Sequence, residues 1–329
     1  MSSFLRSRIF IQQFEQVNWR LQSRAGRASD EGGEMKLLMN GIALTCAAVA
    51  AMPDASGQGA DLTRAEAKMF AASAGYERFM GRWSRLLAPA LIAFAGVRNG
   101  DRVLDVGSGT GSVASAVEAG MPASEIIGID PSEGFVAYAR QNERSGRLRF
   151  EVGDAQALRF DDASFDRTLA LLVMNFIPDP VKAIAEMRRV TRPRGTVSAC
   201  VWDYDAGMQM LRLFWDEAVA LDPAIEPRDE RHMKLSREGQ LADLWRKAGL
   251  VDVRDHPLVI DQAFSSFDDY WAPFTDGAGP GGAYVVSLPD DRRRKLEARM
   301  RKRLLGDRQD GPFTLKAKAW CVRGEVPGN

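Results

Sequence analysis

The chain has 329 residues, and its 44 lysine and arginine side chains are balanced by 44 aspartate and glutamate side chains. This balance excludes the strong positive field with which proteins attract DNA or RNA, so a small-molecule partner is favoured over a nucleic acid. A chain of this length can bury a large core as one elaborated domain or as two modest ones. We expect one domain that carries a cap.

The N-terminal segment does not follow the globular pattern. Residues 35–51, MKLLMNGIALTCAAVAA, combine a lysine, an apolar stretch and a small-residue end, which is the pattern of a secretory signal peptide. Asn40 and Thr45 interrupt the stretch, which is also too short for a membrane span. We favour a disordered or loosely helical extension over residues 1–60, with a working export signal as the alternative.

The three cysteines, Cys46, Cys200 and Cys321, lie far apart and form no CxxC pair. This spacing predicts neither a zinc site nor a disulfide framework. We therefore expect all three thiols to be reduced, Cys200 and Cys321 to be buried in strands, and no metal to be bound.

From Asp61 onward, short β-rich runs alternate with helix-compatible segments. Strands are predicted at residues 102–107, 125–130, 148–154, 165–174 and 195–203. Helices are predicted at residues 112–120, 132–144 and 179–191. The last helix has Asp179 as a candidate N-cap and Pro180 at its first position. Crossover helices between successive strands imply a parallel, doubly wound, Rossmann-like α/β sheet whose ligands bind at the carboxyl ends of the strands.

Beyond residue 205 this alternation weakens, and helical insertions become frequent. Two further strands, at residues 251–260 and 313–322, bring the expected sheet to seven strands, and a Gly/Pro-rich turn is predicted at 276–283. We expect residues 61–205 to form the core and residues 206–329 to complete the same domain. Helices that would close over the site as a cap lie within residues 61–97, 206–222 and 264–304.

One of the later helices is strongly basic. Its sequence, DRRRKLEARMRKRLLG, has a single apolar line of Leu296, Met300 and Leu304 at helical spacing. We interpret it as an exposed cap helix, with binding to a membrane surface or to an anionic substrate as the alternative.

Residues 103–114, VLDVGSGTGSVA, place three glycines directly after the first predicted strand. The dinucleotide fingerprint GxGxxG needs its third glycine where this chain has Ser112, and no Gly-Lys-Ser/Thr follows as in a P-loop. Asp105 lies two residues before Gly107, where its carboxylate would repel a pyrophosphate. The loop therefore favours a cationic ligand. S-adenosylmethionine, which carries an ammonium and a sulfonium, fits this requirement.

VLDVGSGTG resembles the first motif of the class I S-adenosylmethionine-dependent methyltransferases, and the likeness covers about residues 76–203. The runs GYERFMGRWSRLLAPAL, IIGIDPS, VGDAQALRF and FDRTLALLVMNFIPDPVKAIAEMRRVTRPRG look like the subgroup that contains ubiquinone and menaquinone C-methyltransferases. The resemblance implies that Asp130 accepts the ribose hydroxyl protons and that Asp154 with the next N–H reads the adenine edge. It also implies that Leu171 and Tyr76 lie at the methionine end. The candidate cofactor residues are Tyr76, Asp105, Gly107, Ser108, Gly109, Gly111, Asp130, Pro131, Asp154, Ala155 and Leu171.

Two positions depart from the family pattern. Asn175-Phe176 stands where a His-His or His-Asn pair is usual, so a histidine base is not expected there. Pro193-Arg194-Gly195 replaces the usual Pro-Gly-Gly turn, which is a tolerable change.

The acceptor side gives a weaker signal, because large aromatics are core residues more often than site residues. The candidates for a substrate pocket are Trp83, Asn175, Trp202, Asp203 and Trp271. Since the sulfonium already makes the methyl group electrophilic, alignment and desolvation can suffice, and no catalytic residue is assigned. O-, C- and N-methylation of a small molecule stay open. The alternatives are an NAD-dependent oxidoreductase and a non-catalytic methyltransferase-like binding module.

Partners and compartment follow from the same features. The neutral charge and the absence of a base-flipping motif after the fourth strand argue against a nucleic-acid substrate. Membrane contact is not expected, with the N-terminal segment and the basic helix as the two places where it could occur. We expect a cytoplasmic protein, because the cofactor is cytosolic, with export as the alternative. No oligomeric state is assigned.

Overall fold

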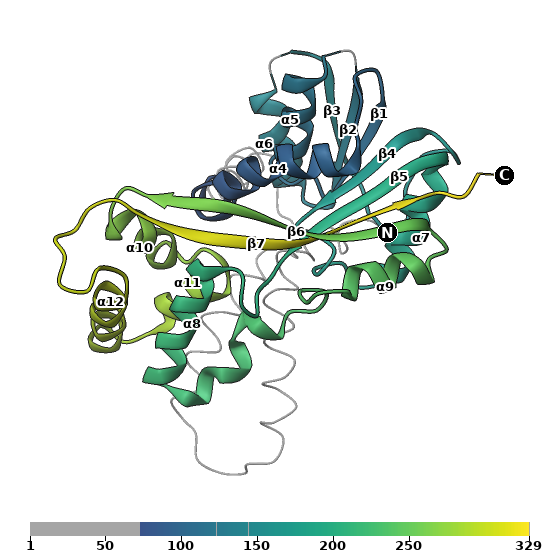
Figure 1. The fold of residues 1–329 in the computed structure, drawn as a ribbon. Coiled ribbons are helices and arrows are strands. Elements are labelled where there is room, and N and C mark those ends of the chain that lie inside the picture. Colours follow the sequence, from purple (N-terminus) through teal and green to yellow (C-terminus); the bar gives the residue numbers. More distant parts are fainter. Residues whose placement is uncertain (1–72, 123, 144, 329) are drawn as a thin grey trace, which may run out of the picture.

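The computed structural model describes residues 73–122, 124–143 and 145–328. In this part of the chain seven strands form one sheet in the order β3-β2-β1-β4-β5-β7-β6 (Figure 1). The first five strands pair in parallel, and β7 runs antiparallel to both of its neighbours. The order reverses between β1 and β4, which is the switch point of a doubly wound sheet. The predicted seven-stranded, mostly parallel, Rossmann-like α/β fold is therefore confirmed.

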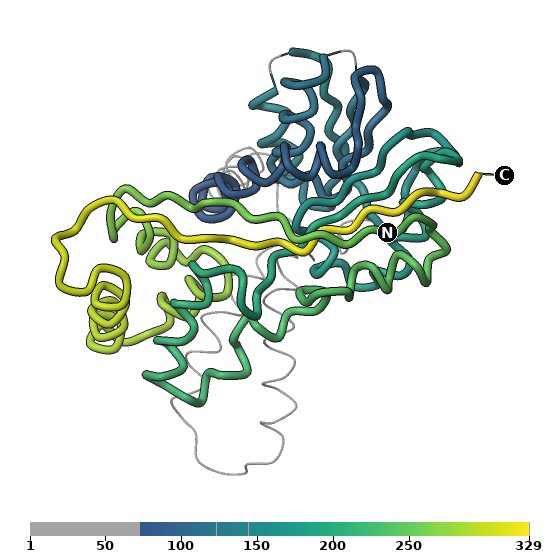
Figure 2. Tube along the Cα trace, in the orientation of Figure 1, coloured from purple at the N-terminus to yellow at the C-terminus, as the bar shows by residue number. Residues whose placement is uncertain are grey.

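The strands nearest the switch point are almost wholly buried, because helices cover both faces of a parallel sheet. The strands are β1 (Arg102–Val106), β2 (Glu125–Asp130), β3 (Leu148–Val152), β4 (Phe165–Leu171), β5 (Thr191–Trp202), β6 (Val251–Phe264) and β7 (Phe313–Glu325). The first four agree closely with prediction. β5 begins earlier than residue 195, and β6 and β7 extend beyond residues 260 and 322, so that the last two form a long ribbon. Figure 2 shows the yellow trace of β7 running along the green trace of β6.

Helices pack on both faces of this sheet. On one face lie α4 (Arg82–Ala95), α5 (Ser112–Gly120) and α6 (Glu133–Asn142). The other face is covered by α7 (Pro180–Val190) and α9 (Gln240–Lys247). The N-cap of α7 is the predicted one, since the Asp179 side chain accepts a hydrogen bond from the N–H of Lys182 at 3.0 Å.

The remaining helices form a separate group on one side of the β6–β7 ribbon (Figure 1). They are α8 (Gln209–Leu221), α10 (Phe267–Thr275), α11 (Gly279–Ser287) and α12 (Asp290–Leu305). Aromatic rings join α8, α10 and α11, and Phe214 stacks on Phe274 with ring centroids 4.4 Å apart. On the basic helix α12, the apolar line faces the protein, since Leu296 and Met300 are buried and Leu304 is half-buried.

Short irregular helices complete the description. A single π-helical turn, η1 (Glu77–Gly81), leads directly into α4. Two 3₁₀ turns, η2 (Pro223–Arg228) and η3 (Glu230–His232), connect α8 to α9.

The prediction of a turn over residues 276–283 is wrong in its second half. Helix α11 already begins at Gly279, and a proline lies in its first turn. Proline has no N–H group, but the first N–H groups of a helix have no intrahelical partner in any case, so proline is compatible with a helix start. The glycines indicated a turn, whereas the buried packing of Gly281, Gly282 and Tyr284 favours a helix.

The two later cysteines are buried in strands, as predicted, but the prediction that they are reduced is wrong. Cys200 in β5 and Cys321 in β7 form a disulfide. The antiparallel register places them opposite each other, with their Cα atoms 4.1 Å apart. The sequence spacing could not reveal this pairing, because the two strands become neighbours only in the folded sheet.

The predictions for residues 1–60, which include the signal-like segment and Cys46, lie outside the described residues. Within the described ranges no helix is both long enough and apolar enough to cross a membrane. The division into a core and a C-terminal part with cap helices stays a prediction.

Candidate cofactor and acceptor site

The glycine loop joins β1 to α5 at the carboxyl edge of the sheet. Gly107, Gly109 and Gly111 have φ angles of 70°, 53° and 92°, a backbone region that favours glycine. A Cβ atom at Gly107 would lie 2.4 Å from a methyl carbon of Val173, so close packing excludes a side chain there. A Cβ atom at Gly109 would meet no atom of the protein within 4 Å. The backbone at Gly109 therefore borders open space that a ligand can approach.

The loop is fixed to β2 by its own N–H groups. Gly107 and Ser108 both donate to the carbonyl oxygen of Ile129, at 2.8 and 2.9 Å. Gly109 donates to the carboxylate of Asp130 at 3.0 Å, and the third glycine donates to the Ser108 carbonyl oxygen at 2.8 Å. These four donors are already used inside the protein. They are not free to cradle a phosphate group, as the loop of a dinucleotide site does.

Asp105 lies in β1 with 1% of its surface exposed. Within the described part of the chain neither of its carboxylate oxygens has a hydrogen-bond partner. Burial raises the pKa of Asp105 to about 7, the nearby backbone N–H of Ala114 acts against the rise, and the Asp130 carboxylate adds to it. A buried, unpartnered carboxylate is costly unless something compensates its charge, so this position suits a cationic ligand group.

Asp130 is the last residue of β2 and is also buried. One oxygen accepts the N–H of Gly109, and the other accepts the N–H of Ser132 at 2.8 Å. Burial raises the pKa of Asp130 to about 6, although these two hydrogen bonds act against the rise. Tyr76 is the N-cap of η1, and burial followed by the charge of Asp130 raises the pKa of its phenol. Its ring also packs against Phe135 with centroids 5.3 Å apart, so the structure brings Tyr76 and Asp130 together.

The other cofactor candidates follow the carboxyl ends of β2, β3 and β4. Pro131 directly follows β2, while Asp154 is exposed in the loop after β3 and accepts the N–H of Gln156 at 2.8 Å. Ala155 is half-buried beside it. Leu171 ends β4, and the next residue, Leu172, has a φ of 60°. A bulky residue in this region is strained, and such strain clusters at functional sites.

Glu77 contacts the glycine loop, which the sequence did not indicate. It lies in the π-helical turn η1, accepts a hydrogen bond from the Thr110 hydroxyl of the glycine loop, and pairs with Arg85. π-helical turns occur often at functional sites. The turn therefore links the segment that carries Tyr76 to the loop that carries the glycines.

The candidates for the acceptor pocket share one feature. Four of the five carry a buried side-chain nitrogen that has no hydrogen-bond partner in the described ranges: Trp83, Asn175, Trp202 and Trp271. Buried polar atoms are normally satisfied by protein, water or ligand. Trp83 packs edge-on against Phe264, and Trp271 lies in the aromatic cluster of the cap helices. The structure places Asn175 after β4 and Trp202 at the end of β5, at the carboxyl edge.

Asp203, the fifth candidate for the acceptor pocket, is engaged in contacts that hold a turn. Its carboxylate pairs with Lys318 of β7 at 2.7 Å and accepts the N–H of Ala206 at 2.9 Å. Lys318 and this hydrogen bond hold the pKa of Asp203 below its usual range, against the effect of burial. The side chain thus fixes the turn between β5 and α8.

Two further residues stand out on the acceptor side, Tyr204 and Glu230. Tyr204 follows Asp203, and burial, the charge of Glu230 and the phenol of Tyr76 all raise the pKa of its hydroxyl. Glu230 is buried in η3, far away in the sequence. Glu230 carried no sequence signal, because the charged stretch EPRDERH resembles a solvated connection. In the described ranges no group of three or more acidic, histidine or cysteine side chains is placed to hold a metal ion.

The sequence and the fold both match known proteins. Residues 104–199 match the methyltransferase domain family. A ubiquinone/menaquinone biosynthesis C-methyltransferase of Geobacter sp. (strain M21) is 33% identical over 121 residues, which is 35% of this chain and 50% of the relative. A demethylmenaquinone methyltransferase of Renibacterium salmoninarum is 32% identical over 148 residues, 45% of this chain and 59% of the relative. The chain spans about half the length of these curated relatives.

A solved structure supports the fold. A protein of Anabaena variabilis assigned as a methyltransferase of an antibiotic biosynthesis pathway aligns with 72% of this chain and 96% of its own, with 15% identity and a TM-score of 0.50. The sheet and the glycine loop thus define a class I S-adenosylmethionine-dependent methyltransferase fold. Residues 104–199 match the methyltransferase domain family, and the chain resembles ubiquinone/menaquinone C-methyltransferases.

Proposed function

We propose that the protein is an S-adenosylmethionine-dependent methyltransferase that acts on a small-molecule acceptor. The observation that carries the proposal is the buried carboxylate of Asp105, whose two oxygens have no partner among the described residues. It lies beside a loop whose backbone approaches open space at Gly109. A ligand with an ammonium group would compensate this charge, whereas a pyrophosphate would be repelled.

The residues fit the cofactor at each of its parts. Asp130 keeps lone pairs for the ribose hydroxyl groups, although each of its oxygens already accepts one backbone N–H. The exposed Asp154 and the N–H of Ala155 would meet the adenine, while Pro131 and Ser108 would line its path. Leu171 and Tyr76 would contact the methionine moiety. Bound there, S-adenosylmethionine would supply a methyl group on a positively charged sulfur.

The protein's part in the reaction is alignment and the exclusion of water. Trp83, Asn175 and Trp202 are buried and have unpartnered nitrogens, so they can orient an acceptor through hydrogen bonds in a dry environment. Asp203 would act on the acceptor only indirectly, by fixing the turn that carries Tyr204. Trp271 belongs to the cap, where it can shape the pocket from a distance.

Calorimetric titration tests the cofactor. We expect the wild-type protein to bind S-adenosylmethionine and S-adenosylhomocysteine and to ignore NAD. Binding of NAD without S-adenosylmethionine would favour the oxidoreductase alternative. Binding of S-adenosylmethionine without methyl transfer to any acceptor would favour a non-catalytic binding module.

We also propose a cytoplasmic location, because the cofactor is made in the cytosol. The Cys200–Cys321 disulfide favours export instead, since disulfides persist mainly in oxidising compartments. N-terminal sequencing of the natural protein distinguishes the two. Cleavage after Ala50 or Ala51 would establish export.

A further inference from the structure

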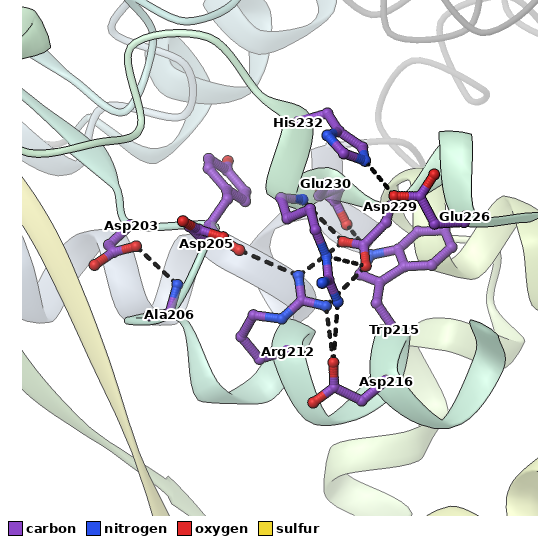
Figure 3. A network of polar contacts seen from close by, with 12 residues as sticks. Asp203, Asp205, Ala206, Arg212, Trp215, Asp216, Glu226, Asp229, Glu230 and His232 are labelled. Carbon is purple, nitrogen blue, oxygen red and sulfur yellow. Dashed lines mark hydrogen bonds and ion pairs between the residues drawn. The ribbon is translucent and has the colours of Figure 1, made fainter. Parts of the chain in front are cut away.

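The connection between α8 and α9 is held by an ion-pair network with one acid left over (Figure 3). Arg212 of α8 makes two hydrogen bonds to the buried carboxylate of Asp229, at 2.7 and 2.8 Å. Arg231 adds a third contact to Asp229 at 2.8 Å, and Asp216 contacts both arginines at 3.2 and 3.1 Å. Two arginines and two aspartates therefore compensate one another.

Glu230, the residue next to Asp229, has no cation of its own. It is 6% exposed, and one of its oxygens accepts the indole N–H of Trp215 at 2.8 Å. No other hydrogen bond reaches the Glu230 carboxylate from the described part of the chain. A buried carboxylate held by a single neutral donor is costly, and sites of this kind are often functional. The network around Asp229 anchors the turn to which Glu230 belongs.

The contacts place Glu230 at the carboxyl edge of the sheet. Arg212 also donates to the carbonyl oxygen of Tyr204, at 3.2 Å, which ties the network to the end of β5. Four residues after Glu230, Lys234 donates to the carbonyl oxygen of Ile177 at 2.7 Å, which ties the same segment to the loop after β4. The segment around η3 therefore spans the ends of β4 and β5.

Several polar side chains surround the Tyr204 hydroxyl near these strand ends. Glu230 and Tyr76 each act electrostatically on the Tyr204 hydroxyl, and the Asn175 side chain also lies close enough to act on it. Asn175 is 3% exposed, and neither its oxygen nor its nitrogen has a hydrogen-bond partner among the described residues. Tyr76 in turn interacts with Asp130 of the cofactor half. The Asn175 amide, the Tyr204 hydroxyl and the Glu230 carboxylate are thus grouped near the ends of β4 and β5.

We propose that Glu230 is a catalytic residue that accepts the proton of the acceptor's nucleophilic atom, with Tyr204 and Asn175 orienting the acceptor. The proposal rests on the proposed methyltransferase function and names its substrate class: an acceptor whose nucleophilic oxygen or nitrogen carries a proton. The lone pair of that atom forms the new bond to the methyl carbon as the carbon–sulfur bond breaks. The electron pair of the broken bond stays on sulfur, and the proton passes to the Glu230 carboxylate.

The charge state of Glu230 suits this role. Burial raises the pKa of Glu230 to about 7, and the charge of Asp229 adds to the rise, while Trp215 and Arg212 act against it. The remaining titratable group that faces it is Tyr204, whose raised pKa keeps its hydroxyl protonated. A base with a pKa close to the working pH can both take up and release the proton.

Methyl transfer to three probes tests the proposal: catechol for O–H, aniline for N–H, and 1-methylindole, a carbon nucleophile that has neither. We expect the wild-type protein to methylate catechol or aniline, and Glu230→Gln to lose at least about 100-fold in kcat. The wild-type rate should fall as the pH decreases below about 7, and the Glu230→Gln rate should not. Glu226→Gln is the matched control, since Glu226 lies on the neighbouring turn, is exposed and, among the described residues, pairs only with His232 at 2.7 Å. It should keep the wild-type rate.

A second variant separates catalysis from folding. Trp215→Phe removes the one hydrogen bond that the Glu230 carboxylate accepts from the described residues, so the pH midpoint of the rate should move to higher pH than in the wild type. Three results would each overturn the proposal. The first is an equal rate for wild type and Glu230→Gln, and the second is methyl transfer to 1-methylindole alone. The third is a protein that binds S-adenosylmethionine but methylates neither catechol nor aniline. Failure to bind S-adenosylmethionine would instead overturn the proposed function. Circular dichroism and S-adenosylhomocysteine binding confirm that each variant is folded.

Discussion

The cofactor half and the acceptor half of the carboxyl edge are built in different ways. On the cofactor side, the loop, Asp105 and Asp130 lie within a short stretch of sequence, and backbone hydrogen bonds fix their geometry. On the acceptor side, Tyr204, Asn175 and Glu230 come from three separate connections, and side-chain ion pairs hold the last of them. The cofactor half is therefore a local structure, whereas the acceptor half depends on tertiary packing. Substitutions should be able to damage one half and spare the other.

The largest loss of stability is expected from Arg212→Met. Removing this guanidinium leaves the buried Asp229 with Arg231 as its remaining cation, and breaking a buried pair costs about 3 kcal/mol or more of unfolding free energy. Affinity for S-adenosylhomocysteine should stay close to the wild-type value at temperatures where the variant is folded. Arg292→Met is the control, because Arg292 forms an exposed pair with Asp222 and should cost at most about 1 kcal/mol. Urea unfolding and calorimetry measure both effects, and a weakened cofactor affinity in Arg212→Met would show that the halves are coupled.

A smaller loss is expected from alanine in the glycine loop. Gly107→Ala meets both the unfavourable φ and the methyl groups of Val173, so we expect it to cost about 2–3 kcal/mol. Gly109→Ala meets only the backbone cost, about 1–2 kcal/mol, because nothing lies within 4 Å of its Cβ position. Thermal unfolding of the two variants measures the difference. If Gly109→Ala proves as unstable as Gly107→Ala, then packing against Val173 is not the reason why position 107 needs a glycine.

The smallest change in stability is expected from Asp105→Asn, which should specifically weaken the binding of the cofactor. The amide removes the charge that would attract the ammonium group of the cofactor, so the affinity for S-adenosylmethionine should fall about 10- to 100-fold. Calorimetric titration measures the affinity. An unchanged affinity would contradict the role of Asp105, and with it the observation that carries the proposed function.

The same variant tests the pH dependence of stability. The folded-state pKa of Asp105, about 7, lies above its ordinary value of 3.8, so the folded protein binds this proton more tightly than the unfolded chain does. The contribution of Asp105 to stability is therefore complete below about pH 4 and is lost as the pH rises to about 7. In urea unfolding of the cofactor-free protein, the free energy of unfolding should decline over this pH range, and the decline should be weaker in Asp105→Asn. If the free energy of unfolding has the same slope against pH in the wild type and in Asp105→Asn, the raised pKa of Asp105 is contradicted.

The difference between the halves also explains what the sequence could predict. Asp105 and Asp130 lie near the ends of strands with clear apolar runs, and the loop glycines follow the first of these strands, so their spacing was enough to place them at one edge. Glu230 could not be found, because its role depends on Trp215 and Arg212 of another helix. The disulfide was missed for the same reason, since Cys200 and Cys321 meet only through strand register. Asp203 was predicted as a pocket residue, and only the structure reveals its ion pair with Lys318.

The position of β7 has a consequence for how the protein is made. β7 is the latest strand in the sequence, yet it lies between β5 and β6. During synthesis β5 and β6 emerge from the ribosome before the strand that separates them, and the sheet cannot be completed until residues 313–325 have emerged. A nascent chain stopped before residue 313 would expose unpaired strand edges to chaperones and to other chains, so this protein must complete its sheet late in translation.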